Sequence, residues 1–96
     1  MSASRNVIVA NRLGLHARAA ARLVNVARQY TSHIRLERAD SGQTADGKGI
    51  YGVLLLTASR GTELIVRAEG DDAERAVNAL CELIERRFEE EGDALY

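Results

Sequence analysis

The residue best placed to do chemistry is His16, which follows a glycine turn and precedes the arginine-rich stretch that begins with Ala17 and Arg18. The first amides of a helix have no intrahelical acceptor, and the helix dipole is positive there. A helix that begins beside His16 would therefore aim the Ala17 and Arg18 amides at a phosphoryl group on the ring, and the Arg18 guanidinium could bind it as well. The same field favours a neutral, nucleophilic imidazole. These features predict a phosphoryl-carrying nucleophile, while the local sequence equally allows a histidine that only caps the helix.

The other reactive side chains have simpler interpretations. Cys81 falls inside a helical pattern with no basic neighbour to activate it, so we expect an inert thiol. His33 begins a strand pattern with no second histidine or cysteine nearby, which predicts a surface residue rather than a metal ligand. Asp71 and Asp72 are suited to capping the last helix. The glycine-rich nucleotide-binding motifs are absent from the sequence.

Hydrophobic periodicity predicts the elements that must position these residues. A stripe of Ala20, Leu23, Val24 and Ala27 indicates a helix from Ala17 to Tyr30. The segment 50–56 is apolar and could be a strand or a short buried helix. The remaining expected elements are strands at 7–10, 33–38, 43–46 and 63–69 and a helix from residue 73 to 88. This order predicts an α+β fold, a largely antiparallel sheet with helices on one face.

Composition limits the class of protein further. With 96 residues, 46% hydrophobic and 28% charged, the chain suits one globular domain. No apolar run is long enough for membrane insertion, and the one cysteine suits a reducing compartment, so we expect a cytoplasmic protein. Residues 1–40 carry a charge of +5 and residues 41–96 carry −6, which indicates a basic face able to steer an acidic partner. Nucleic acid is a poor partner for a chain with net charge −1 and few aromatic residues.

Three segments resemble one known family. Residues 11–20, NRLGLHARAA, resemble the active-site signature of HPr, the histidine-containing phosphocarrier family of the bacterial phosphoenolpyruvate-dependent phosphotransferase system. Residues 46–53, DGKGIYGV, are similar to the second signature of the family, and residues 67–73, RAEGDDA, to the approach to its last helix. The resemblance covers about residues 5–90, which is nearly the whole chain.

The resemblance implies a particular fold. The family has an open-faced β-sandwich, a four-stranded antiparallel sheet with three helices on one face in the order βαββαβα. It therefore implies that segment 50–56 is a short helix. It also implies a single domain over residues 1–96, with a core at about 5–90 and an acidic C-terminal tail at 91–96.

The resemblance also implies an activity. His16 would accept a phosphoryl group on Nδ1 from Enzyme I and pass it to an EIIA domain for sugar uptake, with Arg18 supporting the phosphate. Such a protein is a stoichiometric carrier rather than a turnover enzyme, works as a monomer and needs no cofactor or metal. The residues implied to dock the partners are Ile50, Tyr51, Ala21 and Arg28, with the apolar pair exposed near the active site.

Two departures from the family pattern matter. Ala19 stands where the family usually has proline, and alanine should preserve the helix. Gly49 stands where many members carry a regulatory serine, so that phosphorylation switch is absent here. Three alternatives stay open: a carrier of the nitrogen-related branch, a binding module of the same fold that has abandoned transfer, and a small acylphosphatase-like enzyme.

Overall fold

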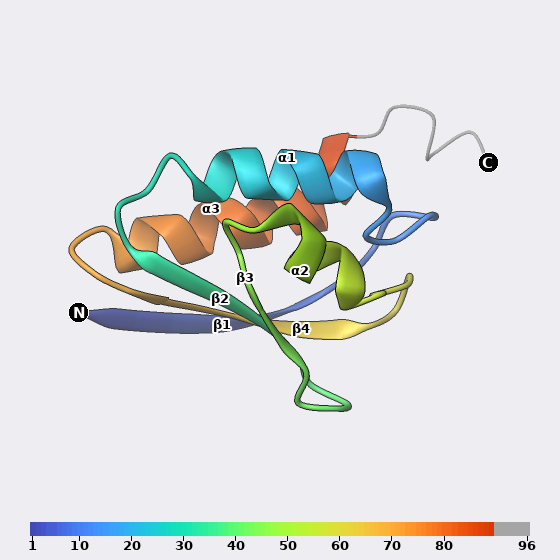
Figure 1. Ribbon diagram of the computed structural model, residues 1–96, viewed down its shortest axis with the longest axis horizontal. Coiled ribbons are helices and arrows are strands. Elements are labelled where there is room, and N and C mark those ends of the chain that lie inside the picture. Colours follow the sequence, from blue (N-terminus) through green and yellow to red (C-terminus); the bar gives the residue numbers. More distant parts are fainter. Residues whose placement is uncertain (90–96) are drawn as a thin grey trace.

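The sheet consists of four antiparallel strands, which lie side by side in the order β1 (Ser2–Ile8), β4 (Glu63–Glu69), β2 (His33–Arg38) and β3 (Thr44–Asp46). We describe residues 1–89, for which the computed structural model defines the fold (Figure 1). The elements are β1 (Ser2–Ile8), α1 (Ala17–Ala27), β2 (His33–Arg38), β3 (Thr44–Asp46), α2 (Ile50–Leu55), β4 (Glu63–Glu69), α3 (Ala73–Glu85) and the 3₁₀ turn η1 (Arg87–Glu89).

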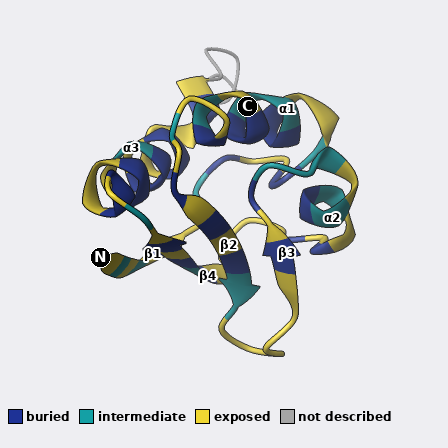
Figure 2. Cartoon of the chain, turned by 60° about the vertical axis from the view of Figure 1, so that its left-hand side comes forward, coloured by how far each residue is buried: buried dark blue, intermediate teal, exposed yellow. Residues whose placement is uncertain are grey.

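The helices cover one face of this sheet, and the opposite face is left open (Figures 1 and 2). Helix α3 packs on β1 and β4, α1 lies against α2 and α3, and α2 lies against β3. Alternate strand residues such as Leu36, Leu64 and Val66 are fully buried under the helices. The α+β fold class and the order βαββαβα are thereby confirmed, and segment 50–56 is a helix through Leu55.

The predicted periodicity of α1 is confirmed, because Ala20, Leu23, Val24 and Ala27 are all buried. The helix also accommodates Ala19 in its first turn, where that side chain is completely buried. It ends at Ala27 rather than at Tyr30, in a tightened turn in which the Gln29 amide donates to the Val26 carbonyl at 3.0 Å.

The first strand begins earlier than predicted. The apolar pattern predicts a start at Val7, but β1 starts at Ser2 and pairs with β4 along its whole length, from Ser2 opposite Glu69 to Ile8 opposite Glu63. Residues 2–6 are mostly polar, so they carry no strand-like alternation of large apolar residues. Backbone hydrogen bonding to β4 forms this part of the strand, and the sheet therefore begins at residue 2.

The expected capping role of the aspartates before α3 is confirmed in position but not in hydrogen bonding. Asp72 occupies the N-cap position, but its side chain makes no capping hydrogen bond. Its two carboxylate oxygens instead accept the Thr31 and Ser32 amides, each at 2.9 Å, and Oδ1 also accepts the Ser32 hydroxyl. The Ser32 hydroxyl and then the Thr31 amide hold the pKa of Asp72 well below its usual range. Asp72 therefore ties the α1–β2 connection to the start of α3.

The end of α3 differs from the prediction as well. The helix stops at Glu85, and the chain turns through positive φ at Arg87, Phe88 and Glu89. This turn places the Phe88 side chain in the core, where it is fully buried, and its carbonyl accepts a hydrogen bond from the Arg22 guanidinium. The predicted acidic tail at 91–96 lies outside the described residues.

Candidate functional site

His16 occupies the N-cap position of α1, with an extended backbone at φ −72° and ψ 177°. Its carbonyl accepts the Ala20 amide at 2.8 Å, which is the first hydrogen bond of the helix. The amides of Ala17 and Arg18 precede that bond and so have no acceptor within the helix. The imidazole is half-buried and makes no capping hydrogen bond to the first turn. The geometry thus favours an anion-binding helix terminus beside the ring over a purely capping histidine.

The loop before His16 is held by backbone contacts to the segment that follows α2. The Leu15 amide donates to the Ala58 carbonyl at 2.9 Å, and the buried Asn11 side chain donates through Nδ2 to the Gly14 carbonyl at 2.7 Å. Gly14 has φ +69°, and a Cβ at this position would lie 2.5 Å from the Ala58 oxygen. Only glycine fits this turn, which fixes the approach of the chain to His16.

The exposed side of α1 is basic. The helix carries Arg18 and Arg22, Arg28 is its C-cap residue, and the first turn contains no acidic residue. Arg22 is committed to the Phe88 carbonyl, and the Nε of Arg28 donates to the Lys48 carbonyl at 3.2 Å. Arg28 therefore joins α1 to the loop before α2. Arg18 is exposed two residues after His16, where its guanidinium is available to an incoming anion.

The predicted docking residues divide into two groups. Tyr51 is 81% exposed, as expected, but Ile50 is half-buried against the core because it lies on the inner side of the first turn of α2. Ala21 is also half-buried. Sequence reasoning missed two exposed leucines, Leu13 in the loop before His16 and Leu55 one helical turn after Tyr51. The spacing of Tyr51 and Leu55 is the available signal, since residues four apart share a helix face.

Gly49 is the N-cap residue of α2, with φ −115° and ψ 113°. A side chain would be accommodated there, because a Cβ would meet only the Asp46 carbonyl oxygen, at 3.8 Å. The backbone at position 49 would therefore accept a serine, so no steric constraint explains why glycine stands there.

The remaining reactive groups lie away from this site. Cys81 is completely buried in α3, and burial raises the pKa of its thiol to about 11, which agrees with the expected inert role. His33 is exposed on the open face of the sheet, as predicted. Within residues 1–89, no three His, Cys, Asp or Glu side chains gather as a metal site, and no helix has the length and apolar character to cross a bilayer.

An open-faced α+β fold with a histidine at a helix N-terminus, followed by an exposed arginine, defines a class of small phosphocarrier domains. The family model described as "PTS HPr component phosphorylation site" matches residues 3–86, and the chain belongs to this family.

Individual relatives agree with this assignment. The chain is 45% identical over 84 residues to Phosphocarrier protein HPr of Pseudomonas aeruginosa, covering 88% of this chain and 92% of that protein. It is 33% identical over 86 residues to Phosphocarrier protein NPr of Shewanella violacea, covering 90% and 92%. The crystal structure of HPr-C-His from Thermoanaerobacter tengcongensis superimposes with a TM-score of 0.87 at 38% identity, covering 93% of this chain and 98% of that one.

Proposed function

We propose that this chain is a cytoplasmic, monomeric phosphoryl carrier that receives its phosphoryl group on Nδ1 of His16 from Enzyme I and donates it to an EIIA domain. The observation that carries the proposal is the position of His16 at the N-cap of α1, next to two amides that precede the hydrogen-bond ladder of the helix. The match of residues 3–86 to the family model supports it.

In the proposed step, the lone pair of the neutral ring nitrogen attacks the phosphorus of the donor in line. A P–N bond to His16 forms while the bond between phosphorus and the donor breaks, and the other ring nitrogen keeps its proton. The amides of Ala17 and Arg18 and the Arg18 guanidinium receive charge on the phosphoryl oxygens. A helix terminus contributes only about 0.3–2 kcal/mol to binding an anion. The phosphoryl group is therefore held weakly enough to move on to the next protein.

Docking would use the exposed apolar side chains on the same side of the fold. Leu13, Tyr51 and Leu55 are 58%, 81% and 68% exposed, and hydrophobic groups of this kind mark protein interaction sites. The Leu15 to Ala58 hydrogen bond brings the loop that carries Leu13 next to the end of α2. An apolar surface flanked by Arg18 suits a partner with an acidic rim around an apolar centre.

The direct test is labelling with radioactive phosphoenolpyruvate and catalytic Enzyme I. We expect base-stable, acid-labile label on the unmodified chain and on His33→Ala, and none on His16→Ala. His33→Ala is the matched control because it removes the other histidine, which is exposed on the open face. Label that persists in His16→Ala would contradict the proposal. Slower labelling of Arg18→Gln, with the fold intact, would support the role of the guanidinium.

A second candidate is a carrier of the nitrogen-related branch. Gly49 in place of the regulatory serine, and the 33% identity to Phosphocarrier protein NPr of Shewanella violacea, favour it. Transfer from phosphorylated chain to purified sugar-type and nitrogen-type EIIA domains separates the two candidates. Faster transfer to the nitrogen-type domain would favour this second function over sugar uptake.

A further inference from the structure

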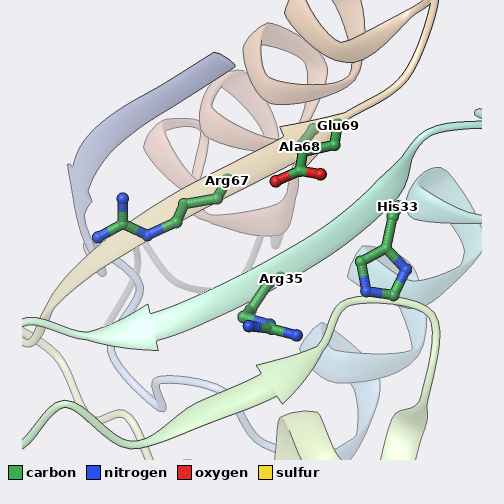
Figure 3. Close-up of a pocket in the computed structure, with 5 residues that line it drawn as sticks. All are labelled: His33, Arg35, Arg67, Ala68 and Glu69. Atoms are coloured by element: carbon green, nitrogen blue, oxygen red, sulfur yellow. The ribbon is translucent and has the colours of Figure 1, made fainter. Parts of the chain in front are cut away.

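Arg38 is a charged residue at an inward-facing position of β2. His33 and Arg35 of the same strand are exposed and point to the open face of the sheet (Figure 3). Ile34 and Leu36 alternate with them and are completely buried under the helices. Arg38 continues this inward-facing row, and its side chain is only 20% exposed. A charged side chain on the covered side of a sheet requires hydrogen-bond partners there.

The partners of Arg38 are carbonyls at the end of α2. Its Nη1 donates to the Leu56 carbonyl at 2.8 Å and to the Thr57 carbonyl at 3.4 Å. The last carbonyls of a helix have no amide partner within it, and a cation beside them is favourable for the helix dipole. Asp40 orients the guanidinium, because its two carboxylate oxygens accept Nε at 3.0 Å and Nη2 at 2.8 Å. Arg38 thereby fixes the hairpin between β2 and β3 to the end of α2.

The segment that Arg38 holds has a strained backbone and leads directly to the support of His16. Thr57 has φ +46°, in the left-handed region that a β-branched residue rarely adopts. Such a conformation persists only where the surrounding contacts hold it. The next residue, Ala58, is buried, and its carbonyl accepts the Leu15 amide at 2.9 Å. A movement of Thr57 would therefore displace Ala58 and, through Leu15, the backbone of His16.

We propose that Arg38 is a positioning residue for phosphotransfer, which holds the loop before His16 through Thr57 and Ala58. This inference rests on the proposed carrier function of His16, and Arg38 acts through these contacts rather than as a ligand of the phosphoryl group. Without the guanidinium, the end of α2 loses a charged donor and the turn at Thr57 is free to relax. The Leu15 amide then loses its acceptor for part of the time, and His16 meets the donor phosphorus in a less defined geometry.

Amide hydrogen exchange of the ¹⁵N-labelled full chain tests this role before any phosphorylation. In Arg38→Gln we expect exchange at Leu15 to become about tenfold faster relative to Leu80, which is buried in α3 and reports on the stability of the whole fold. Arg67→Gln is the matched control, because it removes an arginine of β4 on the open face (Figure 3) and its ion pair to Glu37 at 3.3 Å. It should leave the ratio of the two exchange rates unchanged. Equal acceleration at Leu15 and Leu80 in Arg38→Gln would overturn the proposal.

Two variants of the same hairpin sharpen the test. Asp40→Asn removes an exposed carboxylate that orients Arg38, and we expect it to accelerate exchange at Leu15 about threefold. It keeps the proposal testable if Arg38→Gln does not fold. Gln43→Ala removes a donor to the Leu55 carbonyl at 3.0 Å, which lies before the strained turn, so exchange at Leu15 should stay unchanged. The same acceleration in Gln43→Ala as in Arg38→Gln would contradict a specific role for Arg38.

Single-turnover transfer from phosphorylated Enzyme I provides the functional readout. Arg38→Gln should lower the maximal rate about tenfold and change the half-saturating concentration of the chain less than about twofold, because the docking side chains remain while the geometry of attack is lost. Arg38→Lys keeps the charge without the planar fork that pairs with Asp40, so it should recover part of the rate. The proposal is overturned if only the half-saturating concentration changes, or if Arg67→Gln slows transfer equally. Absence of transfer to the unmodified chain would refute the carrier function, while exchange at Leu15 would still decide whether Arg38 holds the loop.

Discussion

Replacing Gly14 by alanine tests whether the loop before His16 is fixed in the way the structure indicates. Two costs add. A left-handed backbone at φ +69° costs an alanine about 1–2 kcal/mol. The new Cβ would also lie 2.5 Å from the Ala58 oxygen and 2.9 Å from the Ser59 Cα, so the two segments must separate. Separation breaks the Leu15 to Ala58 hydrogen bond, worth about 1 kcal/mol. The expected loss in the free energy of unfolding is about 3 kcal/mol.

The matched control is Gly42→Ala. Gly42 has nearly the same φ, +77°, but a Cβ added there would meet nothing within 4 Å, so this variant incurs only the backbone cost of about 1–2 kcal/mol. Urea unfolding followed by circular dichroism measures both variants. The His16 amide donates to the Gly14 carbonyl at 2.9 Å, so the displacement also reaches His16, and we expect the proposed phosphotransfer to slow by about a hundredfold in Gly14→Ala alone. Equal stability losses in the two variants would refute the packing argument.

Three further predictions concern other parts of the fold. Gly49→Ser should raise the free energy of unfolding by about 0.5–1 kcal/mol, because its hydroxyl can cap α2 without a clash; a loss in urea unfolding would contradict this. Cys81 should react with a thiol reagent only at the rate of unfolding, and fast labelling of the native chain would oppose its burial. Because the pKa of Asp72 is lower in the folded chain than its unfolded value of 3.8, the ionised carboxylate stabilises the fold at pH values above 3.8. This stabilisation is lost progressively as the pH falls from 3.8 toward the pKa of the folded chain. Asp72→Asn should therefore lower the midpoint of urea unfolding at neutral pH, and the difference from the unmodified chain should shrink near about pH 3. Asp71 is exposed, so Asp71→Asn should leave the midpoint unchanged at both pH values.

The elements that could be predicted from the sequence are those with a strong apolar period. The stripe along α1 and the alternation in β2 and β4 are signals that burial itself creates, and the structure confirms them. The polar half of β1 carries no such signal, because its partner β4 lies about sixty residues away in the chain and the pairing is made by the backbone. The N-cap position predicted for Asp72 is confirmed, but the expected capping hydrogen bond is absent for a similar reason: the donors to its side chain, Thr31 and Ser32, are about forty residues away.

The candidate site divides in the same way. The position of His16 at the start of α1, next to Arg18, follows from the local sequence, because a glycine turn and a helical stripe are enough to locate a helix terminus. The support from Ala58 and the exposure of Leu13 depend on how two distant loops meet. No local pattern reports such a contact, and the exposure expected for Ile50 is wrong because the helix turns that side chain inward.

The contacts around His16 also bear on how a carrier can be both accurate and reversible. The Asn11 to Gly14 and Leu15 to Ala58 hydrogen bonds fix the loop through groups other than the proposed ligands of the phosphoryl group. The entropic cost of ordering the loop is therefore met during folding, and docking of a partner need not position His16 again. The phosphoryl group itself would meet only the helix terminus and Arg18, a weak set of ligands for a dianion. A phosphoryl group that passes from one protein to the next requires this combination: a rigid loop that positions the histidine, and few ligands for the phosphoryl group itself.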